Sequence, residues 1–370
     1  MTKSKKILNK KKISLFNRIN QQVLFLFGLI TIVCIFSDFY FQNSNLAIPF
    51  LITTLISSII TYLGIPGLNK IKLKQIIREE GPKNHFIKQG TATMGGIFFV
   101  PVGVIISNIL YFNKDDYKMI VTLSLLTIFF MFIGCIDDLI SLKRNFNTGL
   151  TSNQKLILQL FISIIFIIIC YINNFIPNTI QIGNRLVNIG NLIYPLGIFV
   201  LLAETNSTNL TDGLDGLLSG CSVLIFSGLA ITILIENPSN NTLGPLCMVM
   251  AGSCMGFLFL NKYPAKLFMG DSGSLAIGAS LGGIALISNH LWSLLIMGGV
   301  LAAESVSVII QVIIFKISKK IRGKGYKLFL MTPIHHHFEL QGNKENQIVA
   351  TFWFITLLLI VINIIFIIKS

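Results

Sequence analysis

Uninterrupted apolar runs recur along almost the whole of this 370-residue chain, from Val23 to Ile368. Hydrophobic residues make up 53% of the sequence and charged residues only 12%, which is more apolar sequence than a soluble core needs. Membrane barrels are instead built from segments of about ten residues with alternating polarity. The sequence therefore predicts an all-α, polytopic helical bundle embedded in a lipid bilayer.

Eleven segments are apolar enough to be membrane helices, although the ninth is short for a span of about 20 residues. They are residues 23–41, 46–63, 94–111, 119–136, 156–172, 192–207, 217–236, 243–260, 275–288, 292–315 and 349–368. No small-residue cleavage site follows the first run, so no cleavable signal is predicted.

The basic residues predict an orientation. If all eleven segments cross the bilayer, alternate connections share a side, and one set of connections holds 25 of the 29 Lys and Arg residues. These connections are residues 1–22, 64–93, 137–155, 208–216, 261–274 and 316–348. The positive-inside rule makes that side cytoplasmic. We interpret the run Lys3–Lys12 as a contact for anionic lipid headgroups, and no nucleic-acid partner is predicted.

Five of the 15 acidic residues lie in three short polar clusters, all on the predicted cytoplasmic side. They are Asp137 and Asp138 in GCIDD, Asp212 and Asp215 in NLTDGLDG, and Asp271 in FMGDSGS. Ionisable groups at membrane depth are costly unless they are paired or lie in a wet cavity, and they therefore indicate function. Lys88, Lys143 and Lys155 flank the clusters. Basic residues around fixed carboxylates indicate a site for a polyanion together with a divalent cation.

Each cluster has a chemical and a structural interpretation. Asp137 and Asp138 are a candidate base or shared-proton pair, or else a charged stop at a helix end. Asp212 and Asp215 share one face if the segment is helical, and Gly213 and Gly216 allow a phosphate or nucleobase to approach the backbone. Asp271 suits a Mg²⁺ ligand. Helix capping is the alternative for both of these clusters.

His335, His336 and His337 form a further polar feature on the same side. Three consecutive histidines cannot all face one metal, and no HExxH or Cys/His set supports zinc. They can donate hydrogen bonds to phosphates, or else lie in a solvated loop.

At this point the chain closely resembles the bacterial phospho-N-acetylmuramoyl-pentapeptide transferase family, part of the polyprenyl-phosphate N-acetylhexosamine-1-phosphate transferase superfamily. The resemblance covers residues 46–370. The matching stretches are GPKNHFIKQGTATMGG (81–96), GCIDD (134–138), NLTDGLDGL (209–217), NKYPAKLFMGDSGSLAIG (261–278), AESVSVIIQV (303–312) and MTPIHHHFELQG (331–342). The aspartate motifs are common to the superfamily, whereas the TMGG and HHHFEL stretches belong to this branch.

The resemblance implies a Mg²⁺-dependent, multi-pass enzyme of the bacterial cytoplasmic membrane with its active site on the cytoplasmic face. It would transfer phospho-MurNAc-pentapeptide from UDP-MurNAc-pentapeptide to undecaprenyl phosphate, giving lipid I and UMP in the first membrane step of peptidoglycan synthesis. A homodimer is also implied.

The resemblance also assigns roles by position. Asp271 is the implied Mg²⁺ ligand, with Asp137 and Asp138 near the metal and the lipid phosphate. Implied nucleotide-side residues are Asn209, Asp212, Asp215, Asn261 and the uracil-stacking Phe268. Lys88, Gln311, His335, His336 and His337 would line the sugar-phosphate and uridine pocket.

The chain departs from the family mainly at its N-terminus. Family members have ten spans, whereas this chain adds a basic tail and an apolar segment within residues 1–45, before the transferase domain at 46–370. We expect residues 23–41 to add an eleventh crossing, or alternatively to form an interfacial helix. Ala92 stands where the family usually has proline, and Asn343 and Thr351 replace its usual Trp and Arg.

Two other functions compete with this prediction. A related UDP-N-acetylhexosamine transferase would share the aspartate motifs but lack HHHFEL. An ion-coupled transporter also uses intramembrane acids, but places them near the bilayer midplane rather than at span ends.

Overall fold

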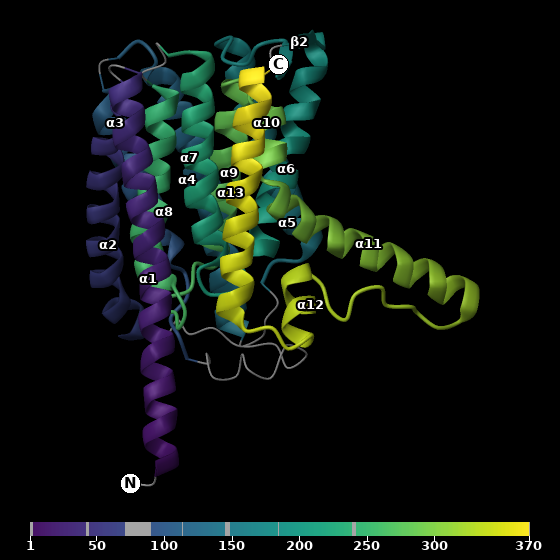
Figure 1. Cartoon of the computed structure of the whole chain (residues 1–370). Helices are drawn as coiled ribbons and strands as arrows, with labels where there is room; N and C mark the ends of the chain where they lie inside the picture. Colours follow the sequence, from purple (N-terminus) through teal and green to yellow (C-terminus); the bar gives the residue numbers. More distant parts are fainter. Residues whose placement is uncertain are drawn as a thin grey trace.

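The computed structural model describes residues 3–41, 44–70, 90–112, 114–144, 149–183, 185–238 and 242–369, with side chains from Gln21 onward. In these ranges the fold is a helical bundle with one short β-hairpin at one end (Figure 1). The helices are α1 Lys3–Tyr40, α2 Ala47–Lys70, α3 Gly96–Tyr111, α4 Tyr117–Arg144, α5 Ser152–Ile172, α6 Ile193–Thr211, α7 Leu217–Glu236, α8 Leu243–Asn261, α9 Asp271–Ile287, α10 Leu291–Met297, α11 Gly299–Arg322, α12 Ile334–Leu340 and α13 Glu345–Lys369. The strands are β1 Thr179–Ile182 and β2 Arg185–Asn188, paired antiparallel.

The predicted all-α membrane bundle is confirmed. Eight helices in the described ranges are long and apolar enough to cross a bilayer: α1 (from Gln21), α2, α4, α5, α7, α8, α11 and α13. Helices α3 and α9 are apolar but shorter. The short helix α12 and the hairpin were not predicted, because neither contains an apolar run of spanning length.

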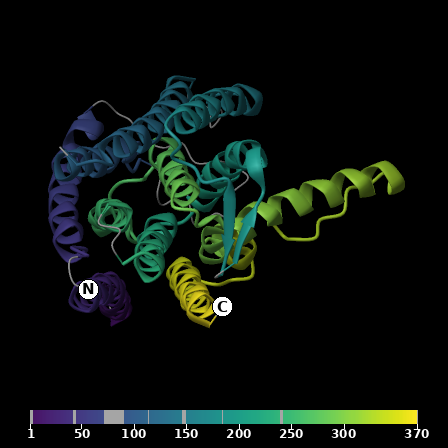
Figure 2. The same ribbon diagram turned by 90° about the horizontal axis from the view of Figure 1, so that it is seen from above.

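The tenth predicted segment, residues 292–315, is not one helix. It is divided at Gly298 into α10 and α11, and α11 projects sideways from the bundle (Figures 1 and 2). The consecutive glycines Gly298 and Gly299 explain the break, since glycine is among the weakest helix formers. An apolar run on both sides of the break concealed it from a prediction based on hydropathy.

Helices α7, α8 and α9 form the centre of the bundle, and nearly all of their residues are buried. Helix α9 lies in the middle when the bundle is seen from above (Figure 2). Two glycines let neighbouring helices approach its first turn. A Cβ on Gly134 of α4 would lie 2.1 Å from the carbonyl oxygen of Asp271, and one on Gly96 of α3 would lie 2.2 Å from the amide nitrogen of Gly273. Backbone contact on two sides therefore determines where α9 begins.

Helix α1 runs along the bundle rather than across its end (Figure 1). Its buried residues Val23, Leu26, Ile30 and Cys34 are three or four apart, so they form one face, and the helix contacts α2, α7 and α8. The carboxylate of Asp38 accepts hydrogen bonds from the amides of Leu46 (2.6 Å) and Ala47 (2.9 Å) at the start of α2. The eleven-crossing topology stays a prediction that this arrangement favours over an interfacial helix.

We predict that Gly134→Ala lowers the free energy of unfolding by about 2 kcal/mol, because the new methyl group must displace the α9 backbone. Gly28→Ala is the matched control, since a Cβ at this α1 position meets no atom within 4 Å. Alanine there should be neutral or stabilising by up to about 1 kcal/mol. Thermal unfolding of the purified protein in detergent measures both, and equal melting temperatures for the two variants would contradict the close-contact argument.

Candidate active site

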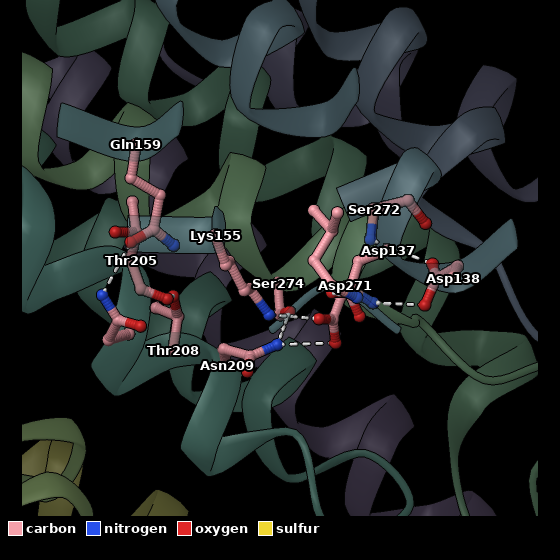
Figure 3. A network of polar contacts seen from close by, with 12 residues as sticks. Asp137, Asp138, Lys155, Gln159, Thr205, Thr208, Asn209, Asp271, Ser272 and Ser274 are labelled. Atoms are coloured by element: carbon pink, nitrogen blue, oxygen red, sulfur yellow. Dashed lines mark hydrogen bonds and ion pairs between the residues drawn. The ribbon is translucent and has the colours of Figure 1, made fainter. Parts of the chain in front are cut away.

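The end of α4, the first turn of α5, the end of α6 and the start of α9 meet at one end of the bundle (Figure 3). Figure 3 shows Asp137 and Asp138 from α4, Lys155 from α5, Asn209 from α6 and Asp271 from α9 grouped together. All of these except the lysine were predicted from sequence as catalytic or nucleotide-side residues. The three polar clusters, far apart in the chain, do meet.

Asp271 is the most connected of these residues. One carboxylate oxygen forms an ion pair with Lys155 Nζ, and the other accepts a hydrogen bond from Asn209 Nδ2 at 2.7 Å. Asn209 Nδ2 also donates to Ser274 Oγ at 3.0 Å. Lys155 is placed by the start of α5, where Thr151 and Gln154 form a reciprocal capping box. Sequence reasoning named Lys155 as a flanking cation but gave it no partner.

Asp138 caps helix α9. Its two carboxylate oxygens accept hydrogen bonds from the amides of Asp271 and Ser272, each at 3.1 Å. Gly270, at φ +72°, precedes the helix, and a Cβ there would lie 2.6 Å from Asp138 Oδ2. Helix capping was the alternative for the α9 aspartate itself; the cap comes instead from α4, 133 residues away in sequence.

Asp137 differs from Asp138 in its surroundings. Its Oδ1 accepts one hydrogen bond, from the Leu150 amide at 3.0 Å, and its side chain is within hydrogen-bonding reach of Asp271. Lys155 is also close enough to act on it electrostatically. Asp137 is therefore the member of the pair that faces the Asp271–Lys155 centre.

These carboxylates fit a hard divalent cation. Within the described residues, no three or more His, Cys, Asp and Glu side chains are grouped to hold a metal ion. Mg²⁺, however, commonly takes only one or two carboxylates and fills its other positions with water and substrate phosphates. Asp137 and Asp271 lie side by side with Lys155 as their shared cation. Adjacent carboxylates repel unless a proton or a cation lies between them.

The turn after α6 is held by side chains predicted to face the nucleotide. Asp215 Oδ2 accepts a hydrogen bond from the Ala265 amide at 2.9 Å. Asn261 Oδ1 accepts from the Gly216 amide at 3.0 Å, and its Nδ2 donates to the Leu267 carbonyl at 3.0 Å. Gly216 has φ +81°, which explains the glycine. Asp215 and Asn261 therefore fasten the turn to the segment after α8.

Asp212 ends α6 and accepts a hydrogen bond from the backbone amide of Gly270. Removal from solvent raises the pKa of Asp212 to about 8, and the neighbouring carboxylates Asp271 and Asp215 act in the same direction. Phe268 lies in the segment before α9, where its amide donates to the Ala92 carbonyl at 2.9 Å, and its side chain is half-buried.

The remaining predicted residues lie around α11 and α12. Gln311 Oε1 accepts hydrogen bonds from the amides of Leu328 (3.0 Å) and Phe329 (2.9 Å), so it fastens the segment that returns from α11. His335 is fully buried, whereas His336 is half-buried, with its Nδ1 2.8 Å from Glu339 Oε2. His337 Nδ1 accepts from the Leu330 amide at 3.2 Å. Lys88 lies outside the described residues.

Two acidic residues of this end were missed from sequence. Glu304 of α11 is fully buried beside His335, and Glu345 Oε1 accepts a hydrogen bond from the Asp215 amide at 2.8 Å. Glu304 interrupts the apolar run AESVSVIIQV, so the rule that drew attention to the aspartates would have found it too. Glu345 follows a polar stretch and carries no comparable signal.

Comparison with known proteins agrees with this architecture. Residues 120–289 match the model of glycosyl transferase family 4. The fold and site thus define the class as a membrane-embedded transferase.

The chain is 75% identical to a phospho-N-acetylmuramoyl-pentapeptide-transferase of Prochlorococcus marinus (strain NATL2A), with all of both chains covered. It is 47% identical to the protein of the same name from Prochlorococcus marinus (strain MIT 9313), covering 90% of this chain and 90% of that one. A Synechococcus sp. (strain CC9311) protein of this name is 46% identical over 89% and 90%. The chain belongs to the phospho-N-acetylmuramoyl-pentapeptide-transferase family. The alignment with the NATL2A protein covers all of both chains, so that relative also contains the N-terminal segment within residues 1–45.

We predict that Asp138→Ala destabilises the protein by about 2 kcal/mol, because two buried amides of α9 lose their acceptor. Asp137→Ala, which removes the acceptor of only one amide, should cost about 1 kcal/mol or less. Thermal unfolding of the two variants in the same detergent tests the difference. A larger loss for Asp137→Ala would show that Asp138 is not the cap of α9.

Proposed function

We propose that this protein transfers phospho-MurNAc-pentapeptide from UDP-MurNAc-pentapeptide to undecaprenyl phosphate, producing lipid I and UMP. The observation that carries the proposal is the convergence of Asp137, Asp271, Lys155 and Asn209 at one end of a membrane bundle in a chain of this family. Phosphoryl transfer depends on alignment and charge neutralisation more than on covalent machinery. A centre of fixed carboxylates and a cation supplies both.

The location follows from charge. We propose a multi-pass protein of the bacterial cytoplasmic membrane with this site on the cytoplasmic face. The connections at this end belong to the set that holds 25 of the 29 basic residues. A soluble nucleotide-sugar can reach a site at the bundle end, while the apolar tail of the acceptor remains in lipid. We also retain the homodimer as a proposal, which rests on the family resemblance alone.

Asp271, together with Asp137, would hold Mg²⁺. When bound, the ion would neutralise negative charge on the donor phosphates. Lys155 holds the Asp271 carboxylate from one side and Asn209 holds it from the other, so the ligand is oriented before substrate arrives. Asp138 would support the site without binding the ion, because its two carboxylate oxygens accept hydrogen bonds from the α9 amides.

The chemical step breaks the bond between the two donor phosphates and forms a bond from the lipid phosphate to the sugar-bearing phosphorus, with UMP leaving. The lipid phosphate is anionic near neutral pH and needs alignment more than deprotonation. We assign alignment or proton acceptance to Asp137, because it faces the centre and, among the described residues, only one of its carboxylate oxygens accepts a backbone hydrogen bond. A covalent intermediate on this aspartate is the alternative to direct attack.

We propose that the nucleotide lies toward Asp212 and Phe268, with the half-buried Phe268 ring available for stacking on uracil. Asp215 and Asn261 support that side by holding the turn. Lys88, Gln311, His336 and His337 are assigned to the sugar-phosphate and uridine pocket, whereas the fully buried His335 would act on it through its neighbours. The acids stand at helix ends, which disfavours an ion-coupled transporter.

The purified protein should release UMP and form lipid I when incubated with UDP-MurNAc-pentapeptide, undecaprenyl phosphate and Mg²⁺. Chromatography of the nucleotide products measures UMP directly. Substitution of UDP-GlcNAc for the donor tests the related UDP-N-acetylhexosamine transferase and should give no UMP. Release of UMP only from UDP-GlcNAc by the folded protein would overturn the proposed donor.

Asp271→Asn should reduce turnover about 100- to 1,000-fold, because the substitution removes the charge that holds the cation and its pair with Lys155. Asp115→Asn is the matched control, since Asp115 is exposed on the connection between α3 and α4, away from the site. Turnover of each variant is measured across a Mg²⁺ titration. An Asp271→Asn variant with unchanged turnover and Mg²⁺ dependence would remove Asp271 from the metal site.

A further inference from the structure

A fully buried acid–histidine pair joins α11 to α12. Both Glu304 and His335 have no exposed side-chain surface, and His335 Nδ1 lies 3.1 Å from Glu304 Oε2. The same oxygen lies 3.4 Å from the His335 amide, so one carboxylate holds both the ring and the backbone of the residue. An isolated buried carboxylate is strongly unfavourable, and this pairing is what allows Glu304 to be buried.

The opposite side of the His335 ring presses on the turn after α6. A Cβ on Gly213 would lie 2.2 Å from His335 Nε2, so only glycine leaves room for the ring. Gly213 does not have a positive φ, unlike Gly216 three residues later. Glycine is therefore required at the two positions of the DGLDG motif for different reasons. Gly216 allows a left-handed backbone, and Gly213 makes space for His335.

A second contact joins α11 directly to α6. Ser305 Oγ, next to Glu304, donates a hydrogen bond to Ser207 Oγ of α6 at 2.8 Å. Helix α11 is thus fixed to α6 one turn before the turn that carries Asp212. The His335 ring therefore lies between Glu304 of α11 and Gly213 after α6. These two elements are themselves joined by the serine hydrogen bond.

We propose that Glu304 is a positioning residue: it holds His335 against Gly213 and thereby sets the turn bearing Asp212 for the nucleotide-sugar donor. This inference rests on the proposed function for its consequence in turnover, but the contact itself is independent of it. The branch-specific histidine motif and the aspartate motif common to the superfamily then act as one unit. Loss of the unit weakens donor binding and leaves the lipid side unchanged.

Steady-state kinetics tests the consequence. Glu304→Ala should raise KM for UDP-MurNAc-pentapeptide about tenfold, with little change in KM for undecaprenyl phosphate. Glu304→Gln keeps an oxygen that can accept from the His335 amide and lie beside Nδ1, and it should stay within about threefold of the unmodified protein. The control is Glu236→Ala, which breaks a different Glu–His pair, Glu236 with His290 at 2.7 Å, at the far end of α7. Equal donor KM values for Glu304→Ala and Glu236→Ala would overturn the proposal.

A double-mutant cycle tests the contact with Gly213. Gly213→Ala should raise donor KM about tenfold, because its methyl group displaces the His335 ring. In a His335→Ala background the same change should add less than about twofold, since the ring is gone. Fold-changes that simply multiply would show that Gly213 and His335 act separately, and would overturn the proposal even if Glu304→Ala fails to fold.

Hydrogen exchange gives a readout that does not depend on activity. Amides within residues 209–216 should exchange about tenfold faster in Glu304→Ala than in the unmodified protein, and at an unchanged rate in Glu236→Ala. Unchanged exchange in folded Glu304→Ala would overturn the positioning role. If the unmodified protein releases no UMP, the proposed function fails, while this measurement still decides whether Glu304 and His335 hold the turn.

Discussion

The capping of α9 by Asp138 is the contact on which the rest of the site depends. Two amides at the start of a buried helix need acceptors, and a carboxylate from α4 supplies both. The contact fixes the first residue of α9, Asp271, in position and direction. Once Asp271 is placed, Lys155 and Asn209 can hold its two oxygens from α5 and α6. Four helices are thereby joined through one helix start.

For Asp138 to reach these amides, α4 must pack closely against the backbone of α9, and Gly134 and Gly270 make this possible. Gly134 precedes Asp138 by one helical turn and lies against the Asp271 carbonyl, while Gly270 leaves room for the Asp138 carboxylate itself. The N-terminal end of a helix carries partial positive charge, which favours carboxylates there. Close packing therefore lets Asp138 and Asp271 share one helix end, with Lys155 paired to the Asp271 carboxylate.

Much of this could be predicted from sequence, for identifiable reasons. Apolar runs predicted the bundle, and the distribution of basic residues predicted that the aspartate motifs lie at one end of it. Both predictions were possible because each signal is summed over many residues. The break at Gly298 was missed, since hydropathy does not register a change of helix direction. Asp138 and Asp137 are adjacent in sequence, and only the fold distinguishes the capping residue from the one that faces the centre. Glu304 interrupts an apolar run and could have been found from sequence, but its pairing with His335, 31 residues away, is seen only in the fold.

The arrangement around His335 suggests why a histidine motif belongs at this end of the bundle. A metal is not needed to explain it: His335 is held by Glu304 and packs on Gly213, so it acts as a wedge between α11 and the turn after α6. Helix α11 leaves the bundle at the break after α10, and its base is also fixed to α6 by the Ser305–Ser207 hydrogen bond. The break at Gly298 therefore directs α11 away from the bundle, and the buried Glu304–His335 pair holds the base of α11 in place.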